Sequence, residues 1–202
     1  MNFQSDVTKL GEFDISFLRN RIVDLPESAW NEDQKRQEIF EAHTHTQTIK
    51  LLFDPDYRHE NPTRHKAFDE FQPLVKPFQE HIKSSYCKTL RQKKVIAKNG
   101  PGYFVRIILT RLLPSSEITP HVDDGYSLKR CHRIHVPIIT NEKCTFKVGA
   151  SAIKMRAGEM WEINNRRIHA VKNNGDEARV HLIMDYVQPG EMVYDQEGPL
   201  TA

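Results

Sequence analysis

The spacing of apolar residues along the chain changes near residue 100. Before that point they recur at intervals of three and four, the period of an amphipathic helix. Two such sets are Ile15, Leu18, Ile22 and Leu25, and Phe68, Phe71, Val75, Phe78 and Ile82. Asp14 is placed to cap the first helix, and a second helix is predicted after Pro26. Pro73 and Pro77 predict a kink or a break in the longer helix, and a strand is expected at residues 46–53.

After residue 100 the apolar pattern shortens to a period of two, as in β-strands. Predicted strands cover residues 103–113, 131–139, 144–148, 151–155, 160–163, 169–173 and 178–187, separated by turn-forming residues. Short strands at regular spacing predict a mainly β fold, either a sandwich or a jelly-roll barrel, with the helices covering one face. We expect one domain over residues 1–202, with a mostly helical part at 1–100 and the jelly-roll core at 101–190.

Composition removes several classes of protein. The 202 residues carry 29 Lys and Arg against 27 Asp and Glu, and a net charge of +2 argues against a nucleic-acid partner. No apolar run approaches the roughly 20 residues of a membrane span, and no signal-peptide region begins the chain. Three cysteines without a CxxC spacing favour a reducing cytoplasm. What stands out is ten histidines, five of them between positions 121 and 181.

The segment around His121 carries the first candidate chemistry. In an extended chain residues i and i+2 point the same way, so His121 and Asp123 project onto one face. His169 lies 46 positions after Asp123 and is the third candidate. Two histidines and one carboxylate form the facial triad of non-haem Fe(II) oxygenases, which leaves coordination positions open. The His-x-Asp spacing alone has little specificity.

A buried cation sharpens this hypothesis. Arg179 lies ten residues after His169 within an otherwise apolar strand, where an unpaired charge is costly. A carboxylate matches the planar fork of its guanidinium. Arg133 and His135 form a similar pair on a neighbouring predicted strand. A dicarboxylate bridging metal and arginine would satisfy these groups together, and 2-oxoglutarate is the obvious candidate.

The order of these motifs resembles the aspartyl/asparaginyl β-hydroxylase family of Fe(II)- and 2-oxoglutarate-dependent oxygenases. The resemblance covers most of residues 46–187 and rests on PHVD at 120–123, RIHVPII at 133–139, GEMWEINN at 158–165, HAVKN at 169–173 and RVHLIMDY at 179–186. It implies a double-stranded β-helix, a cupin-like jelly roll with helical cover. Vertebrate founding members of the family carry Gly where this chain has Asp123, so the full triad is more similar to bacterial and amino-acid-hydroxylating relatives.

The resemblance also implies roles for individual residues. His121, Asp123 and His169 match the iron ligands, and Arg179 matches the residue that holds the distal carboxylate of 2-oxoglutarate. Thr110 lies 11 positions before His121 and matches a hydroxyl that assists this arginine. Arg133 and His135 match residues that contact the other end of the cosubstrate, although His135 is equally well read as a hydrogen-bonded core histidine.

The sequence therefore predicts a dioxygenase that uses Fe(II), 2-oxoglutarate and O2 to hydroxylate an unactivated C–H bond, releasing succinate and CO2. The substrate is left open among an amino acid, a peptidyl residue and a small metabolite, and the oligomeric state is not readable. Two alternatives remain: a cupin-like metal-dependent dioxygenase that does not use 2-oxoglutarate and so has no need of Arg179, and a non-catalytic jelly-roll binding module, in which a broken triad would be expected.

Overall fold

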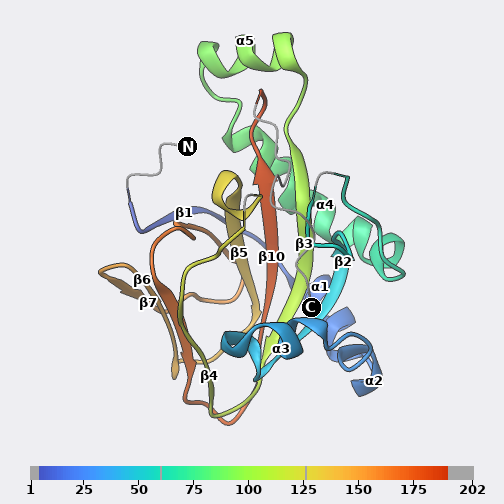
Figure 1. Cartoon of the computed structure of the whole chain (residues 1–202), viewed down its shortest axis with the longest axis vertical. Helices are drawn as coiled ribbons and strands as arrows, with labels where there is room; N and C mark the ends of the chain where they lie inside the picture. Colours follow the sequence, from blue (N-terminus) through green and yellow to red (C-terminus); the bar gives the residue numbers. More distant parts are fainter. Residues whose placement is uncertain (1–4, 60, 126, 191–202) are drawn as a thin grey trace.

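Two antiparallel sheets face each other in the computed structural model, which describes residues 5–59, 61–125 and 127–190 (Figure 1). The larger sheet has the strand order β1 (Val7–Glu12), β8 (Glu159–Ile163), β5 (His132–Ile139), β10 (Arg179–Val187), β3 (Tyr103–Leu112) and β2 (Thr46–Leu52). The smaller sheet has the order β4 (Ser116–His121), β9 (His169–Asn173), β6 (Cys144–Val148) and β7 (Ser151–Ile153). The mainly β, jelly-roll architecture predicted from the sequence is confirmed.

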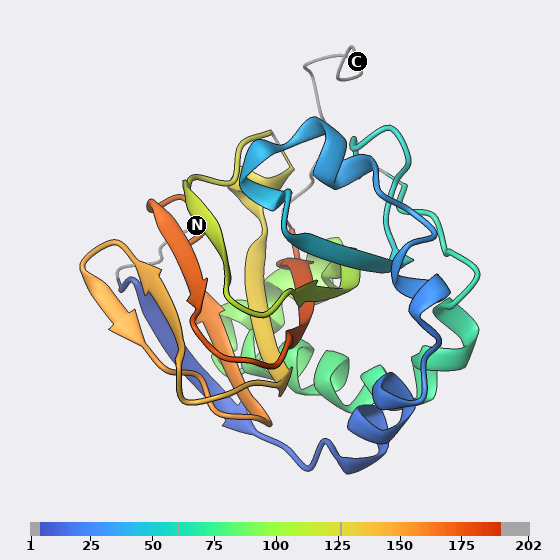
Figure 2. The same ribbon diagram turned by 90° about the horizontal axis from the view of Figure 1, so that it is seen from below.

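Helices cover the outer face of the larger sheet. The helices that add buried residues to this face are α1 (Ser16–Val23), α2 (Glu27–Trp30) and α4 (Phe68–Ser85). The other helical elements are α3 (Lys35–Ile39), α5 (Leu90–Asn99) and the 3-10 turns η1 (Glu41–His43) and η2 (Leu128–Arg130). Seen from below, the strands of the smaller sheet lie across from the larger one and α4 lies on its far side (Figure 2). Helix α5 extends away from the sheets and has no buried residue.

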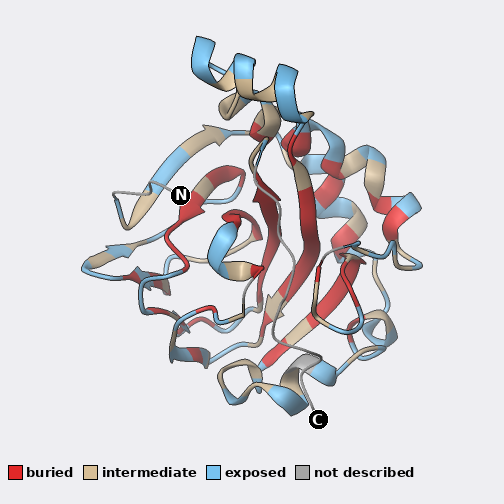
Figure 3. Cartoon of the chain, turned by 45° about the horizontal axis from the view of Figure 1, so that its top comes forward, coloured by how far each residue is buried: buried red, intermediate tan, exposed pale blue. Residues whose placement is uncertain are grey.

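The central strands are buried on both faces, and the two faces differ in chemistry (Figure 3). On β10 the apolar residues Val180, Leu182 and Met184 belong to the same core cluster as the α4 stripe Phe71, Val75, Phe78 and Ile82. The alternate residues of β10 point toward the smaller sheet, and they include Arg179, His181 and Asp185. The helices therefore complete the hydrophobic core, while the space between the sheets receives the polar side chains.

Strand register aligns these inward-facing polar residues into rows. Asp185 of β10 pairs in register with Arg106 of β3 on one side and with Arg133 of β5 on the other. Further along β10, His181 is in register with Thr110 of β3. One end of the inner face thus carries an Arg–Asp–Arg row and the other carries Thr110, His181 and Arg179.

Close packing of the edge strands depends on Gly158, which precedes β8. Its φ of +85° lies in the region that L side chains rarely adopt, and an added Cβ would lie 2.5 Å from the carbonyl oxygen of Phe13. The backbone of Gly158 accepts a hydrogen bond from Phe13 and donates one to Pro137, at 2.9 Å each. This glycine therefore joins the segment after β1 to β5.

Some local predictions differ from the structure. Helix α4 runs unbroken across Pro73 and Pro77, so a break there is wrong. The helix expected after Pro26 is divided into the short α2 and α3. Asp14 accepts a hydrogen bond from the Ser16 amide at 2.9 Å, but the helix cap itself is Ile15. Strands β1 and β4 were not among the predicted strands. No helix within the described residues has the length and apolar character needed to cross a membrane, and the three cysteines are free.

Candidate metal centre and the pocket around it

The three predicted metal ligands converge at one end of the space between the sheets. His121 ends β4, His169 begins β9, and the two residues pair in register. Asp123 follows two residues after His121, and its amide donates to the Asn165 carbonyl at 3.2 Å. One ligand atom from each of the three residues lies within 4.8 Å of the others. Asp123 and His169 are buried, whereas His121 is partly exposed.

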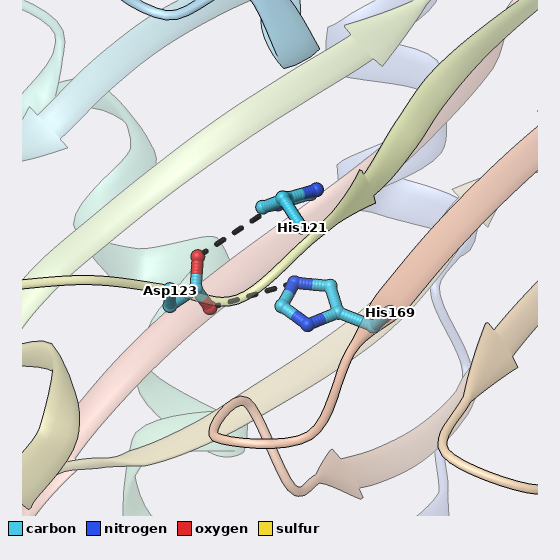
Figure 4. Close-up of side chains that lie close together, drawn as sticks. All are labelled: His121, Asp123 and His169. Carbon is cyan, nitrogen blue, oxygen red and sulfur yellow. Dashed lines mark ion pairs between the residues drawn. The ribbon is translucent and has the colours of Figure 1, made fainter.

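Backbone carbonyl groups orient both imidazole rings. Nδ1 of His121 lies 2.7 Å from the Thr119 carbonyl oxygen, and Nδ1 of His169 lies 3.0 Å from that of Arg167. Because a carbonyl only accepts, each Nδ1 carries the proton and each Nε2 keeps its lone pair free. These Nε2 atoms face the Asp123 carboxylate, at 4.0 Å for His121 and 3.6 Å for His169 (Figure 4). Burial lowers the pKa of His169, with Asp123 opposing, which favours the neutral, metal-binding form.

Arg133 binds the carboxylate of Asp123. Its guanidinium donates two parallel hydrogen bonds of 2.8 Å to Asp185, which is fully buried, and its remaining nitrogen donates to Asp123. Burial by itself would lower the pKa of Arg133, but Asp123 and Asp185 outweigh it and the pKa is raised. Arg133 is therefore charged, and its geometry depends on Asp185.

The other end of the inner face carries a cation that has no carboxylate partner among the described residues. Arg179 is 1% exposed, and its Nη2 lies 2.5 Å from Nδ1 of His181 while its Nε has no hydrogen-bond partner. Its guanidinium lies over the Phe146 ring, 5.6 Å from the centroid. Burial lowers the pKa of Arg179 to about 10, and only the Cys144 thiol opposes this. The buried hydroxyl of Thr110 also lacks a hydrogen-bond partner.

His135 and His181 complete this polar pocket. Their Nδ1 atoms are 3.3 Å apart, and Nε2 of His135 is buried without a hydrogen-bond partner. Burial lowers the pKa of both histidines well below the usual value, with the Arg179 cation adding to the effect. Beside two neutral imidazoles, a hydroxyl and a guanidinium thus present donors that an anionic oxygen-rich ligand would satisfy.

A cavity of about 420 Å³ opens onto the metal cluster. It is lined by η1 and its neighbours, by the loop at 56–59, and by residues 121–125, 127 and 128. Arg106 of β3 and Asp123 reach it from the interior. The ring of His43 lies 5.3 Å from the ring of His121, so His43 borders the candidate metal site.

The family model of aspartyl/asparaginyl β-hydroxylases matches residues 31–189. The chain belongs to this family. Membership confirms the resemblance drawn from the motifs and the prediction of a 2-oxoglutarate-dependent hydroxylase. The match also takes in α3 and η1, which lie outside the 46–187 region of the resemblance.

Solved structures place the fold among the 2-oxoglutarate- and Fe(II)-dependent oxygenases. An oxidoreductase of that family from Burkholderia pseudomallei superposes with a TM-score of 0.56 at 11% identity, covering 91% of this chain and 94% of the other. The viral collagen prolyl hydroxylase from Paramecium bursaria Chlorella virus-1, in complex with 2-oxoglutarate, gives 0.54 at 11% identity, with coverage of 91% and 96%. No curated protein sequence matches significantly.

The residues of this hydroxylase fit an iron ion and 2-oxoglutarate. The donor set of two Nε2 atoms and one carboxylate suits Fe(II). The orphaned polar atoms of Thr110, His135 and Arg179 lie in a compartment that needs an anion. All seven predicted site residues therefore lie on the inner faces of the two sheets or in the loop beside them, in two groups: the triad with Arg133, and Arg179 with Thr110 and His135.

Sequence reasoning missed Arg106 and Asp185. Both are charged residues inside apolar strands, in YFVRIILT at 103–110 and LIMDYV at 182–187. This is the same signal that singled out Arg179 and Arg133, so it also marks Arg106 and Asp185. His59 was also missed, and it carried no periodic signal because it lies in the loop after β2.

Proposed function

We propose that the chain uses Fe(II), 2-oxoglutarate and O2 to hydroxylate an unactivated C–H bond of an amino acid, a peptidyl residue or a small metabolite, with succinate and CO2 as co-products. The observation that carries the proposal is the convergence of His121, Asp123 and His169 next to a buried compartment whose arginine has no carboxylate partner.

Each group has a defined task in this proposal. His121, Asp123 and His169 hold the metal on one face, and Arg133 fixes the Asp123 carboxylate against rotation. Arg179 binds the distal carboxylate of 2-oxoglutarate with help from Thr110, and His135 lines the path between that carboxylate and the metal. Bound iron and cosubstrate supply the oxidising power, and the protein supplies position, charge balance and a site shielded from water.

The test is oxygen-dependent formation of succinate with added Fe(II) and 2-oxoglutarate, measured beside the anaerobic difference absorbance of the iron–cosubstrate complex. His169→Ala is expected to lose both signals, whereas Arg19→Gln, which changes an exposed arginine on α1, is expected to keep both. A His169→Ala protein that keeps both signals at full strength contradicts the assignment of the ligands.

A further inference from the structure

Arg106 is a second buried arginine whose surroundings the proposed reaction does not explain. It is 4% exposed and reaches the cavity from β3. Its Nη2 donates to Nε2 of His59 at 3.3 Å, and Nδ1 of His59 lies 2.7 Å from the Ser127 hydroxyl. The guanidinium lies over the Phe53 ring, 4.4 Å from the centroid. These contacts hold the Arg106 guanidinium in the inner wall of the cavity, but none of them provides a negatively charged partner.

Among the described residues, the carboxylate within ion-pair distance of Arg106 is that of Asp185, and it is already engaged. Asp185 makes its two hydrogen bonds of 2.8 Å with Arg133, and Nε of Arg106 stands 3.6 Å away from it without a hydrogen bond. Burial lowers the pKa of Arg106, and Asp185 offsets this only in part, whereas the same carboxylate with Asp123 raises the pKa of Arg133. Arg106 and Arg133 thus lie near the same two carboxylates, Asp185 and Asp123, and the hydrogen bonds of both carboxylates go to Arg133.

The cosubstrate cannot be the missing anion of Arg106. Arg179 lies six residues before Asp185 on β10, which is on the order of 20 Å along the strand. Arg106 lines the cavity and Arg179 does not. Beside Asp123, the inner faces of β3, β5 and β10 present three guanidiniums and one further carboxylate among the described residues. A divalent iron and a 2-oxoglutarate dianion cancel, so one buried positive charge stays unbalanced, which is costly.

The cavity itself supports a small, partly apolar occupant. Its volume of about 420 Å³ lies in the range of small-molecule sites. Ile39, Phe40, Ala42, Val122 and Leu128 supply apolar lining, and Arg58 adds a second guanidinium whose buried Nε has no hydrogen-bond partner. Tyr57 and His59 flank Arg58 with φ of 62° and 61°, a strained backbone of the kind kept at ligand sites.

We propose that Arg106, assisted by Arg58, forms an anion subsite beside the metal that selects a small substrate bearing a free carboxylate over neutral or internal peptidyl substrates. This inference rests on the proposed function, because it places the reacting carbon between the subsite and the metal. A guanidinium held in place by His59 and the Phe53 ring can bind a carboxylate with little loss of side-chain entropy.

The experiment compares acids with their own amides. The full chain is loaded with Ni(II), which does not support turnover, and with N-oxalylglycine in place of 2-oxoglutarate. The twenty L-amino acids, their carboxamides and a set of phosphate monoesters are then titrated by calorimetry. At least one acid is expected to bind wild type tenfold or more tightly than its amide. Acids that bind are incubated with the Fe(II) enzyme and inspected for a product heavier by one oxygen.

Variants of Arg106 and Arg58 test whether these arginines cause the preference for acids over amides. Arg106→Gln is expected to reduce the acid-over-amide ratio to about one, and Arg58→Gln to reduce it severalfold. Arg19→Gln, an exposed arginine outside the cavity, is the matched control and keeps the ratio. Because Arg106 is buried, the unfolding midpoint of each variant is measured first. If Arg106→Gln does not fold, Arg58→Gln at the partly exposed wall decides the question.

The proposal is overturned if no acid binds more tightly than its amide, if phosphate monoesters are preferred, or if Arg106→Gln keeps the full ratio. These failures are separate from failure of the proposed function. A protein that binds metal and N-oxalylglycine but shows no preference for acids refutes the subsite alone, whereas one that binds neither refutes the proposed function.

Discussion

At the scale of single residues, the buried arginines differ in the groups that surround them. Arg133 is surrounded by two carboxylates, and the pair with Asp185 is complete in the protein as folded. Arg179 has a histidine, an aromatic ring and an orphaned Nε, with no carboxylate in contact. A buried guanidinium with this surrounding stabilises a ligand more than it stabilises the fold, because its counter-ion arrives from outside.

Removing the Arg179 charge is expected to weaken binding of 2-oxoglutarate. Charge-assisted hydrogen bonds contribute about 1.5–3 kcal/mol, so Arg179→Gln should raise the Kd for 2-oxoglutarate by about tenfold or more. Thr110→Val removes a neutral donor and should cost about fivefold. Anaerobic titration of the iron-loaded protein measures both, with Arg19→Gln as the control. An unchanged Kd in Arg179→Gln would favour a metal-dependent dioxygenase that does not use 2-oxoglutarate.

The same pocket predicts how stability depends on pH in the metal-free protein. His135 and His181 have a lowered pKa when folded, against 6.5 for the unfolded residue. Below about pH 6.5 the unfolded chain binds more protons, so the free energy of unfolding falls as pH decreases, by up to about 2.7 kcal/mol per pH unit for two groups.

Urea unfolding between pH 7.5 and 5.5 checks this, since the carboxyl groups with lowered pKa titrate at lower pH. The double variant His135→Gln, His181→Gln should show a flatter profile. A wild-type stability that is constant over this range would contradict neutral, buried histidines.

At the scale of elements, Gly158 offers a clean comparison with Gly100. Both have a positive φ, +85° and +81°, but an added Cβ at Gly100 meets nothing within 4 Å, whereas at Gly158 it meets the Phe13 carbonyl. Gly100→Ala should cost about 1–3 kcal/mol from backbone strain alone. Gly158→Ala should cost clearly more, because the backbone of β5 and of the segment after β1 must separate. Chemical denaturation measures both, and equal costs would mean that Phe13 moves freely.

The central strands that the sequence predicted are those with one continuously apolar face. Strands β3, β5 and β10 carry apolar residues at every second position because the helix-covered face demands them. Strand β4 buries only Ile118, and β1 is an edge strand with mixed exposure, so neither produced a period-two apolar pattern. Helix α5 buries nothing, and its basic residues suggested a solvated face without revealing the helix.

At the scale of the whole molecule, the candidate site exists because two sheets are joined. His121 and His169 come from the smaller sheet, whereas Arg133 and Asp185 come from the larger one. Family motifs pointed to the triad and Arg179, whose roles stay predictions. They did not reveal the row formed by Arg106, Asp185 and Arg133, because strand order and register across β3, β10 and β5 are long-range properties that no local pattern encodes.

Metal binding should therefore stabilise the whole fold. A ligand at 100 times its Kd adds about 2.7 kcal/mol to the free energy of unfolding. Co(II), as an air-stable probe, is expected to raise Tm, and EDTA should reverse the shift. Asp123→Asn should abolish it, whereas Asp124→Asn, which changes the exposed neighbour paired with Lys129, should keep it. If Co(II) shifts the Tm equally in Asp123→Asn and Asp124→Asn, the metal binds elsewhere.

The way the two imidazole rings are held has a consequence for which side chains the site requires. In both cases the acceptor is the peptide carbonyl two residues earlier, at Thr119 and at Arg167, and not a side chain. Any amino acid at those positions supplies the same acceptor. The groups that orient the two rings therefore depend on backbone geometry and not on which side chains stand at these two positions.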